Sequence, residues 1–154
     1  MEKNSKKRRR PNVKKKGNNY EILIRNSLRK IGLDKTRTSR DASKLYDDCG
    51  IDHWGAILPD SSMLLTQCKA GYNYHRPKAD VEFANQQSKL KENFPENSAE
   101  LDVRNIQVLF HKLDGYKDHR HLVTVKYKDF MKLLTAYKNE LLRTPRSKSE
   151  PDKG

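Results

Sequence analysis

Two apolar stretches separated by a short turn constrain this chain most, because they predict a β-hairpin with polar groups gathered at one end. Residues 51–58 (IDHWGAIL) and 63–70 (MLLTQCKA) each have the length of a buried strand, and the intervening Pro-Asp-Ser-Ser supplies the turn. Asp52 begins the first stretch, whereas Gln67 and Lys69 lie near the end of the second. Since residues two apart on a strand share a face, these three side chains are expected to converge at one rim of the sheet.

Helical and alternating apolar spacing extends this prediction along the chain. Before the hairpin we expect a helix from Asn18-Asn19 to a Gly32 C-cap, an edge strand over 35–40 and a loop over 41–50. After the hairpin we expect an exit loop over 71–77, a helix over 79–94 capped by Asp80 and a connector over 95–102. Strands over 105–112 and 121–127 and a helix over 130–141 complete the expected order. This alternation predicts an α/β fold with a central mixed sheet flanked by helices.

Length and charge predict one folded domain between two polar ends. The 154 residues suit a single core, which we place at 18–142. Of the net charge of +13, residues 1–17 contribute +8, because nine Lys and Arg stand there against one Glu. We therefore expect a basic disordered arm over 1–17 and a disordered tail over 143–154.

The basic arm predicts a polyanionic partner. Clustered Lys and Arg side chains attract phosphates by releasing counterions, and the candidate DNA contacts here are Lys6, Lys7, Arg8, Arg9, Arg10, Lys14, Lys15 and Lys16. A nuclear-import signal is the alternative interpretation of the same clusters. No apolar run approaches a membrane span, and two Cys without a CxxC spacing indicate a reducing compartment. We expect a cytoplasmic protein, with a nuclear location left open and no membrane partner.

The polar rim of the hairpin has the donor types that a hard divalent cation prefers. Mg²⁺ takes oxygen ligands, keeps several waters and needs only one or two carboxylates. Asp52 offers a carboxylate, and the Gln67 amide oxygen and the Cys68 backbone carbonyl offer neutral ligands. Lys69 can orient an attacking water and stabilise charge that develops on a phosphate.

At this point the chain resembles the PD-(D/E)XK nuclease superfamily, with Asp52 in the Asp position and Gln67-Cys68-Lys69 in the (D/E)-X-K position. More narrowly, it looks like the archaeal-type and phage Holliday-junction resolvases. Those proteins have a helix glutamate soon after a glycine, as Glu21 follows Gly17 here. A serine-containing loop, a Gly-X-Asp strand, the metal-and-lysine strand and a glutamine-bearing helix then follow. The resemblance spans about residues 17–130.

The resemblance implies a restriction-endonuclease-like fold and a metal-dependent, structure-selective DNA endonuclease of recombination and repair, acting as a homodimer on four-way junctions. It implies Mg²⁺, with Mn²⁺ as a substitute, and no small-molecule cofactor. By position, Glu21, Asp52 and Gln67 would be catalytic metal ligands and Lys69 the catalytic lysine, with Cys68 adding its carbonyl. Arg40, Ser43 and Gln86 would contact DNA. The chain departs from the pattern at Gln67, where most members have Glu, and this loss of charge should weaken metal binding.

Plainer interpretations exist for each residue. Asp52 could cap a turn, Lys69 could be a surface lysine, and Glu21 could pair with Arg25 one helical turn away. His53 is expected to pack or face solvent, and the histidines at 111, 119 and 121 are expected to be solvated and not to bind zinc. Two functional alternatives remain open, namely another nuclease of this fold (restriction, repair-nicking or RNA-processing) and a non-catalytic nucleic-acid-binding protein.

Overall fold

The computed structural model describes residues 13–72, 78–97, 105–113 and 121–143. The elements in chain order are α1 (Val13–Lys30), β1 (Arg37–Thr38), α2 (Ser39–Ala42), α3 (Lys44–Asp48), β2 (His53–Trp54), β3 (Leu64–Tyr72), α4 (Ala79–Asn93), the 3-10 helix η1 (Pro95–Asn97), β4 (Ile106–Leu113), β5 (Leu122–Val125) and α6 (Tyr127–Arg143). The predicted α/β class is therefore confirmed at this level.

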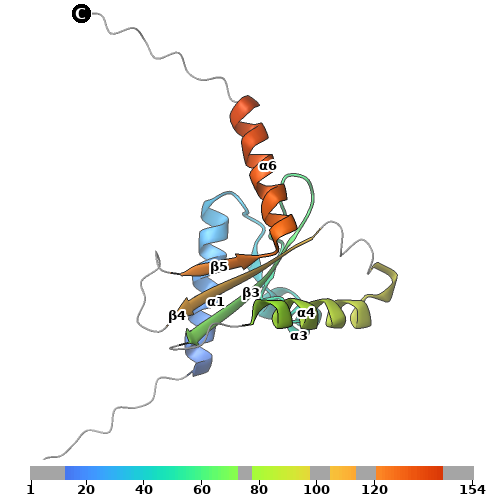
Figure 1. Ribbon diagram of the computed structural model, residues 1–154. Coiled ribbons are helices and arrows are strands. Elements are labelled where there is room, and N and C mark those ends of the chain that lie inside the picture. Colours follow the sequence, from blue (N-terminus) through green and yellow to red (C-terminus); the bar gives the residue numbers. More distant parts are fainter. Residues whose placement is uncertain (1–12, 73–77, 98–104, 114–120, 144–154) are drawn as a thin grey trace, which may run out of the picture.

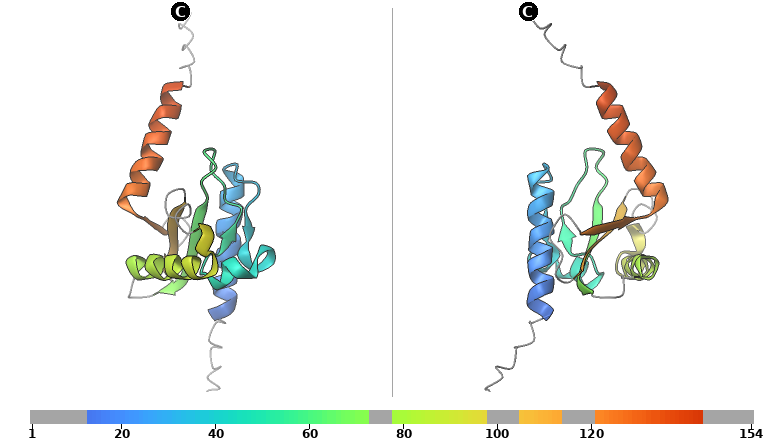
Figure 2. Two further views of the ribbon diagram at one scale, coloured as in Figure 1. Left: turned by 90° about the vertical axis from the view of Figure 1, so that its right-hand side faces the viewer. Right: turned by 60° about the vertical axis from the view of Figure 1, so that its left-hand side comes forward.

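A mixed sheet lies at the centre, with helices on both faces (Figures 1 and 2). β3 pairs with β4 in parallel, with Leu64 opposite Ile106 and Cys68 opposite Phe110, and β4 pairs with β5 antiparallel. A separate two-stranded ladder joins β1 to β2. The parallel pairing of β3 and β4 requires a crossover connection, which α4 provides.

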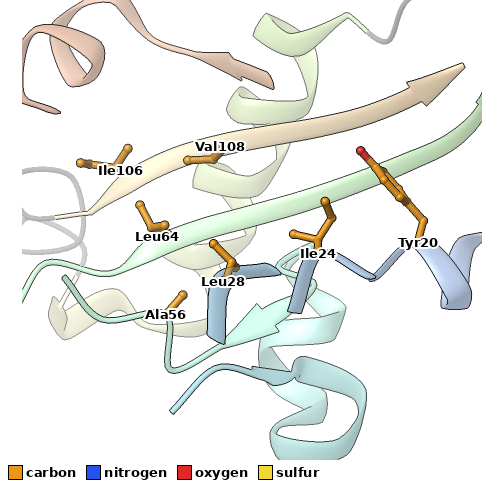
Figure 3. Close-up of a cluster of buried hydrophobic side chains, with 7 residues drawn as sticks. All are labelled: Tyr20, Ile24, Leu28, Ala56, Leu64, Ile106 and Val108. Carbon is orange, nitrogen blue, oxygen red and sulfur yellow. The ribbon is translucent and has the colours of Figure 1, made fainter. Parts of the chain in front are cut away.

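Alternation along β3 divides the core into two layers. Leu64 faces α1, where it meets Tyr20, Ile24 and Leu28 together with Ala56, Ile106 and Val108 (Figure 3). Leu65 faces the other side and packs with Cys49, Ile51 and Leu90. Because successive strand residues point to opposite faces, the same alternation sends Gln67 and Lys69 toward α4.

The amino-terminal helix ends as expected but begins earlier. Gly32 has φ of +102°, and the N–H groups of Gly32 and Leu33 donate to the carbonyls of Arg29 and Leu28, which is a Schellman C-cap. The helix begins at Val13 and not after Asn18-Asn19. Residues 13–17 of the expected disordered arm are therefore helical, which their three lysines favour as good helix formers and Gly17 disfavours.

The segment before β3 differs from the prediction. The expected strand over 51–58 is regular only at β2, which pairs with β1, although Ile57 still bridges to Met63 near the turn. The interruption falls at Gly55, where φ is +78° and a Cβ would lie 2.5 Å from the Lys35 carbonyl oxygen. A close approach of this kind bulges the strand toward β1.

Residues 41–50 were expected to form a loop, and that expectation is wrong. α2 and α3 cover most of the segment, and buried Cys49 and Ile51 anchor its end. Tyr46 of α3 packs against Trp54 at 4.3 Å and Phe94 at 5.2 Å between ring centroids. These tertiary contacts stabilise helices that are too short to show periodicity in the sequence.

The carboxyl-terminal half follows the prediction closely. The helix over 79–94 is confirmed as α4, although Lys78 and not Asp80 occupies its N-cap position. The expected strands are β4 and β5, and the last helix is α6. The exit-loop residues 73–77, connector residues 98–104 and the turn at Asp114-Gly115 lie outside the described residues, as do residues 1–12 and 144–154.

Candidate functional site

Asp52 lies against the edge of β3 that does not pair with β4. Its N–H donates to the Thr66 carbonyl at 2.8 Å, and its carboxylate Oδ2 accepts a hydrogen bond from the Cys68 N–H. On its other side, its carbonyl accepts from the Ser39 N–H at the start of α2, also at 2.8 Å. Asp52 is thus held between a helix start and the strand that carries the other candidate residues.

Burial makes the negative charge of Asp52 costly. Loss of solvation is the main reason that the pKa of Asp52 rises from 3.8 to about 7, with the nearby Glu21 and Asp47 carboxylates raising it further. The Cys68 N–H and the Lys69 ammonium act in the opposite direction. A carboxyl group with such a pKa is partly protonated at neutral pH, and a cation placed beside it would favour the ionised form.

Gln67 and Lys69 meet a third residue, Glu82 at the start of α4. The Lys69 ammonium lies 3.2 Å from Glu82 Oε1, and the Gln67 amide Nε2 donates to Glu82 Oε2 at 3.0 Å. The Gln67 Oε1 atom is buried and has no hydrogen-bond partner among the described residues. One carboxylate from a helix therefore organises both side chains of the Gln-X-Lys pair.

Glu82 was not identified by the sequence analysis. The signal was present in principle, since Glu82 is an acidic residue in the first turn of the helix that follows the lysine strand. A first-turn acid is also a common helix-stabilising feature. Only the packing of α4 on the Gln67 face of β3 distinguishes the two interpretations.

Glu21 reaches the same region from α1, and its partner is not Arg25. The Arg40 guanidinium of α2 contacts both carboxylate oxygens of Glu21 at 3.2 Å and also donates to the Asn18 side chain, whereas Arg25 donates to Asn26. Burial raises the pKa of Glu21 in spite of Arg40, with the Asp47 and Asp41 carboxylates adding to the increase. The expected i,i+4 pair is therefore replaced by a tertiary ion pair.

His53 fixes Glu21 relative to β3. It is fully buried, with its Nδ1 at 2.7 Å from the Thr66 hydroxyl and its Nε2 at 2.7 Å from the Glu21 carbonyl oxygen. Because a carbonyl only accepts, Nε2 carries the proton and Nδ1 accepts from Thr66. Burial also lowers the pKa of His53, which keeps the ring neutral. The expectation that His53 packs is confirmed, and its contacts give that packing a positioning role.

Gln86, which was expected to contact DNA, is buried and serves the site indirectly. Its exposed fraction is 2%, and its Nε2 donates to the Gly50 carbonyl at 3.0 Å. Its Oε1 accepts from Gln107, which also donates to the Phe83 carbonyl. A side chain enclosed in this network does not present itself to DNA, so the prediction is corrected. Gln86 instead holds the backbone two residues before Asp52 against α4.

The other expected DNA contacts lie at the surface or outside the described residues. Arg40 is exposed but engaged by Glu21, and Ser43 is half-buried between α2 and α3 without a side-chain cap. Of the basic clusters, Lys14, Lys15 and Lys16 lie in the first turns of α1, and Lys6, Lys7, Arg8, Arg9 and Arg10 lie outside. Lys14 stands seven residues before Glu21, about two helical turns away on the same side of α1.

No group of three or more His, Cys, Asp or Glu side chains in the described part of the chain is arranged to hold a metal ion. The histidines at 111, 119 and 121 were expected to be solvated, and this is wrong for His111, which is buried on β4, whereas His121 is half-buried and His119 lies outside the described residues. No described helix is sufficiently long and apolar to cross a membrane. The candidate centre thus consists of Asp52 beside β3, with Glu21 and Glu82 approaching on opposite faces.

Comparisons with known proteins add no relative. No family of sequences, no curated protein and no solved structure matches this chain.

Proposed function

We propose that this protein is a metal-dependent DNA endonuclease with a restriction-endonuclease-like fold, and most specifically a Holliday-junction resolvase. One observation carries the proposal. The Asp52 carboxylate is held against β3 at Cys68, between the two positions whose side chains are Gln67 and Lys69. The order of α1, the Asp52 segment, β3 and α4 is also that of the motifs in the family that the sequence resembles.

The donor groups fit a hard divalent cation such as Mg²⁺ or Mn²⁺. Asp52 provides a desolvated carboxylate, and Gln67 Oε1 is a buried oxygen that lacks a partner among the described residues. In a strand, the N–H and C=O of one residue leave on the same edge. The Cys68 carbonyl therefore points toward the edge where its N–H meets Asp52. One carboxylate with neutral oxygens and waters is a sufficient set for Mg²⁺.

Glu82 offers the charge that Gln67 lacks. In the sequence pattern, replacement of Glu by Gln at position 67 removes a carboxylate from the centre. The structure has a carboxylate within hydrogen-bond distance of that amide, supplied by α4. We infer that Glu82 acts with Gln67 as one ligand position, and that Glu21 adds a carboxylate from α1.

Each residue then has a chemical role. When bound, a divalent cation would lower the pKa of a coordinated water and offset negative charge on the scissile phosphate. Lys69 would donate to the attacking water or a phosphate oxygen, and its ion pair with Glu82 holds the ammonium at the site. Arg40, on the Glu21 side, would exchange its carboxylate partner for a phosphate of the substrate strand.

The branched substrate and the homodimer are carried over from the resemblance. Two centres in a dimer could nick opposed strands of a four-way junction, and the basic amino-terminal segment would add backbone affinity. Selection by shape is compatible with an amino-acid sequence in which few motifs for reading bases are recognisable. Another nuclease of this fold would act on linear duplex or RNA.

A non-catalytic nucleic-acid-binding protein is the second candidate. Two observations favour it, namely the Gln at position 67 and the absence of a three-carboxylate group in the described residues. In that case Lys69 and Glu82 would be only a structural ion pair.

The test is cleavage of a labelled four-way junction with and without Mg²⁺, compared with linear duplex and RNA of the same sequence. Nicking should require the cation, and Asp52→Asn and Lys69→Ala should each reduce it by about 10²–10³-fold while leaving junction binding intact. Lys89→Ala, an exposed lysine on α4, is the matched control. Metal-independent binding without nicking would favour the second candidate, and full activity in either variant would remove the proposed centre.

A further inference from the structure

The last helix, α6, leaves the body of the protein with most of its apolar side chains exposed. Figures 1 and 2 show it extending away from the sheet and from the other helices. Among its residues only Asp129 is buried, and Leu133 packs against the core at the base. Tyr127 is 80% exposed, Tyr137 is 64% exposed and Leu142 is 76% exposed.

The exposed apolar residues of α6 have the spacing of a coiled-coil seam. They are Tyr127, Phe130, Leu134, Tyr137 and Leu141, separated by three, four, three and four residues. This 3-4 spacing defines the a and d positions of two heptads, which bury their side chains against another helix. With a rise of about 1.5 Å per residue, the seam is about 21 Å long. The element of a partner that fits this seam is therefore another helix and not an irregular loop.

The ends of the chain have the wrong composition to cover this seam. Residues 144–154 (TPRSKSEPDKG) contain no large apolar residue, and residues 1–12 contain only Met1. Residues 73–77, 98–104 and 114–120 each contain at most two large apolar residues. A segment of the same chain could cover the seam only if it contained several apolar side chains in helical spacing. None of these segments has that composition.

The exposed area is about what a stable dimer requires. The side chains of the seam, together with Met131 and Leu142, are between 41% and 80% exposed. With about 150–250 Å² for each aromatic side chain and somewhat less for each Leu or Met, they present on the order of 700–900 Å². Stable protein interfaces bury about 800 Å² on each partner. A monomer rarely exposes a contiguous apolar patch of that size.

A cleft of about 960 Å³ lies on the flank of α6 next to the seam. It lies between α6 and the hairpin turn, with Leu58 and Pro59 on one wall, Leu133 and Tyr137 on the other, and Ile106 also lining it. Tyr137 belongs to both the cleft and the seam. The other α6 residues that line the cleft lie outside the seam, so the cleft marks the side of α6 that faces the body, and the seam is left open to a partner.

We propose that a second copy of this chain covers the seam, with the two α6 helices packed antiparallel about a two-fold axis level with residues 135 and 136. In this register Leu134 of one copy meets Tyr137 of the other, and Phe130 meets Leu141, so each a position packs against a d position. Because each α6 joins its body at the Tyr127 end, antiparallel packing places the two bodies at opposite ends of the helix pair. It also aligns the helix dipoles favourably. The functional meaning of this dimer, two paired catalytic centres, rests on the proposed function, whereas the dimer itself does not.

Sedimentation equilibrium of the full chain at micromolar concentration tests the dimer. We expect a species of twice 18.0 kDa. Leu134→Asp combined with Tyr137→Asp should raise the dimer dissociation constant on the order of 100-fold. The circular dichroism spectrum should remain that of a folded protein, since both side chains are already exposed in the single copy. A monomer in the unsubstituted protein, or no weakening in the folded double variant, would overturn the proposal.

Disulfide cross-linking tests the register. The double variant Phe130→Cys with Leu141→Cys should form a covalent dimer under mild oxidation, because these two positions face each other across the pair and are too far apart to link within one helix. Thr135→Cys on an outward position of the same helix should not exceed the unsubstituted protein with its native Cys49 and Cys68. Efficient self-linking of Tyr127→Cys would mean parallel helices and would overturn the antiparallel arrangement. These results are independent of catalysis. A monomer that nicks junctions would refute the dimer alone, and a dimer that never cleaves would refute only the proposed function.

Discussion

At the scale of the residue, the feature with the widest consequences is the buried charge of Asp52. Its pKa in the folded protein is about 7, against 3.8 for an ordinary aspartic acid. Because the folded state binds this proton more tightly than the unfolded state, the contribution of Asp52 to stability is complete below about pH 4 and is lost as the pH rises through 7. Strongly shifted pKa values of this kind are concentrated at functional sites.

Asp52→Asn should therefore stabilise the protein at alkaline pH and not at acid pH. The variant retains an oxygen for the Cys68 N–H but cannot ionise. In a chelating buffer we expect its melting temperature to exceed that of the unsubstituted protein by several degrees at about pH 8, with the difference disappearing near pH 4. Thermal denaturation followed by circular dichroism at both pH values measures this. A difference that does not change with pH would show that the charge of Asp52 is not the cause.

The proposal that Glu82 and Gln67 act as one metal-ligand position can be tested by exchanging the Glu and Gln side chains between the two positions. Glu82→Gln should weaken Mn²⁺ binding about tenfold or more, and Gln67→Glu should strengthen it, because a carboxylate is a better ligand than an amide. The double variant Gln67→Glu with Glu82→Gln transfers the carboxylate from position 82 to position 67. Its affinity for Mn²⁺ should be close to that of the unsubstituted protein. Isothermal titration with Mn²⁺ measures all three.

Glu92→Gln, an exposed acid on the same helix, is the control for this exchange. If Glu82→Gln binds Mn²⁺ as tightly as the unsubstituted protein, Glu82 is only the partner of Lys69. Failure of the double variant to recover affinity would mean that the geometry of the α4 carboxylate matters and not only its charge.

At the scale of the element, the irregular segment between β2 and β3 positions the site. Ile51 is buried in one core layer and Ala56 in the other, as expected for residues an odd number apart on an extended segment, so side chains of this segment contribute to both layers. Gly55 permits the bulge in this segment, since its backbone conformation and its approach to Lys35 both exclude a side chain. The bulge allows β2 to pair with β1 while Asp52 still bonds to β3.

Gly55→Ala should therefore destabilise the protein, by about 1–3 kcal/mol in the free energy of unfolding. The added Cβ would lie 2.5 Å from the Lys35 carbonyl oxygen, which is a backbone atom that cannot rotate away. Urea denaturation measures the change. Gly17→Ala is the matched control, because its Cβ would enter open space within α1 and should leave stability unchanged or raise it by up to about 1 kcal/mol. Equal effects of the two substitutions would contradict the role given to Gly55.

At the scale of the whole molecule, charge is distributed unevenly. Residues 1–12 contain six Lys and Arg against one Glu, whereas residues 144–154 contain three against two acids. The candidate site lies on the folded body, and α1 connects that body to the basic end. In the proposed endonuclease, the basic amino-terminal residues would add phosphate contacts to those of the lysines that begin at Lys14.

Deletion of residues 1–12 should weaken DNA binding and reduce its dependence on salt. Each lost phosphate contact lowers the slope of log K against log salt by about 0.9, so removal of six basic residues could lower it by up to about 5. Fluorescence anisotropy over a salt series measures the slope. Deletion of residues 144–154, a segment of similar length and nearly balanced charge, should change it little. An unchanged slope after the amino-terminal deletion would show that these residues do not contact phosphate.

Several predictions from sequence were confirmed because they depend on local rules. The Gly32 cap, α4, the strand that became β3 and the last helix follow from turn chemistry and from the spacing of apolar residues. The short helices α2 and α3 were missed because packing around Tyr46 and Cys49 stabilises them. The burial of Gln86 was missed for a related reason, since its partners Gly50 and Gln107 are distant in the sequence.

The sequence by itself determined that Gln67 and Lys69 share one face of a strand and that an aspartate precedes that strand, because side chains alternate along any extended chain. Only the tertiary structure decided which carboxylates lie around them. Packing of α1 and α4 on opposite faces of the sheet brings in Glu21 and Glu82, from residues far apart in the chain. The same packing excludes solvent from Asp52 and raises its pKa, which is a property of the assembled interior and of no single segment.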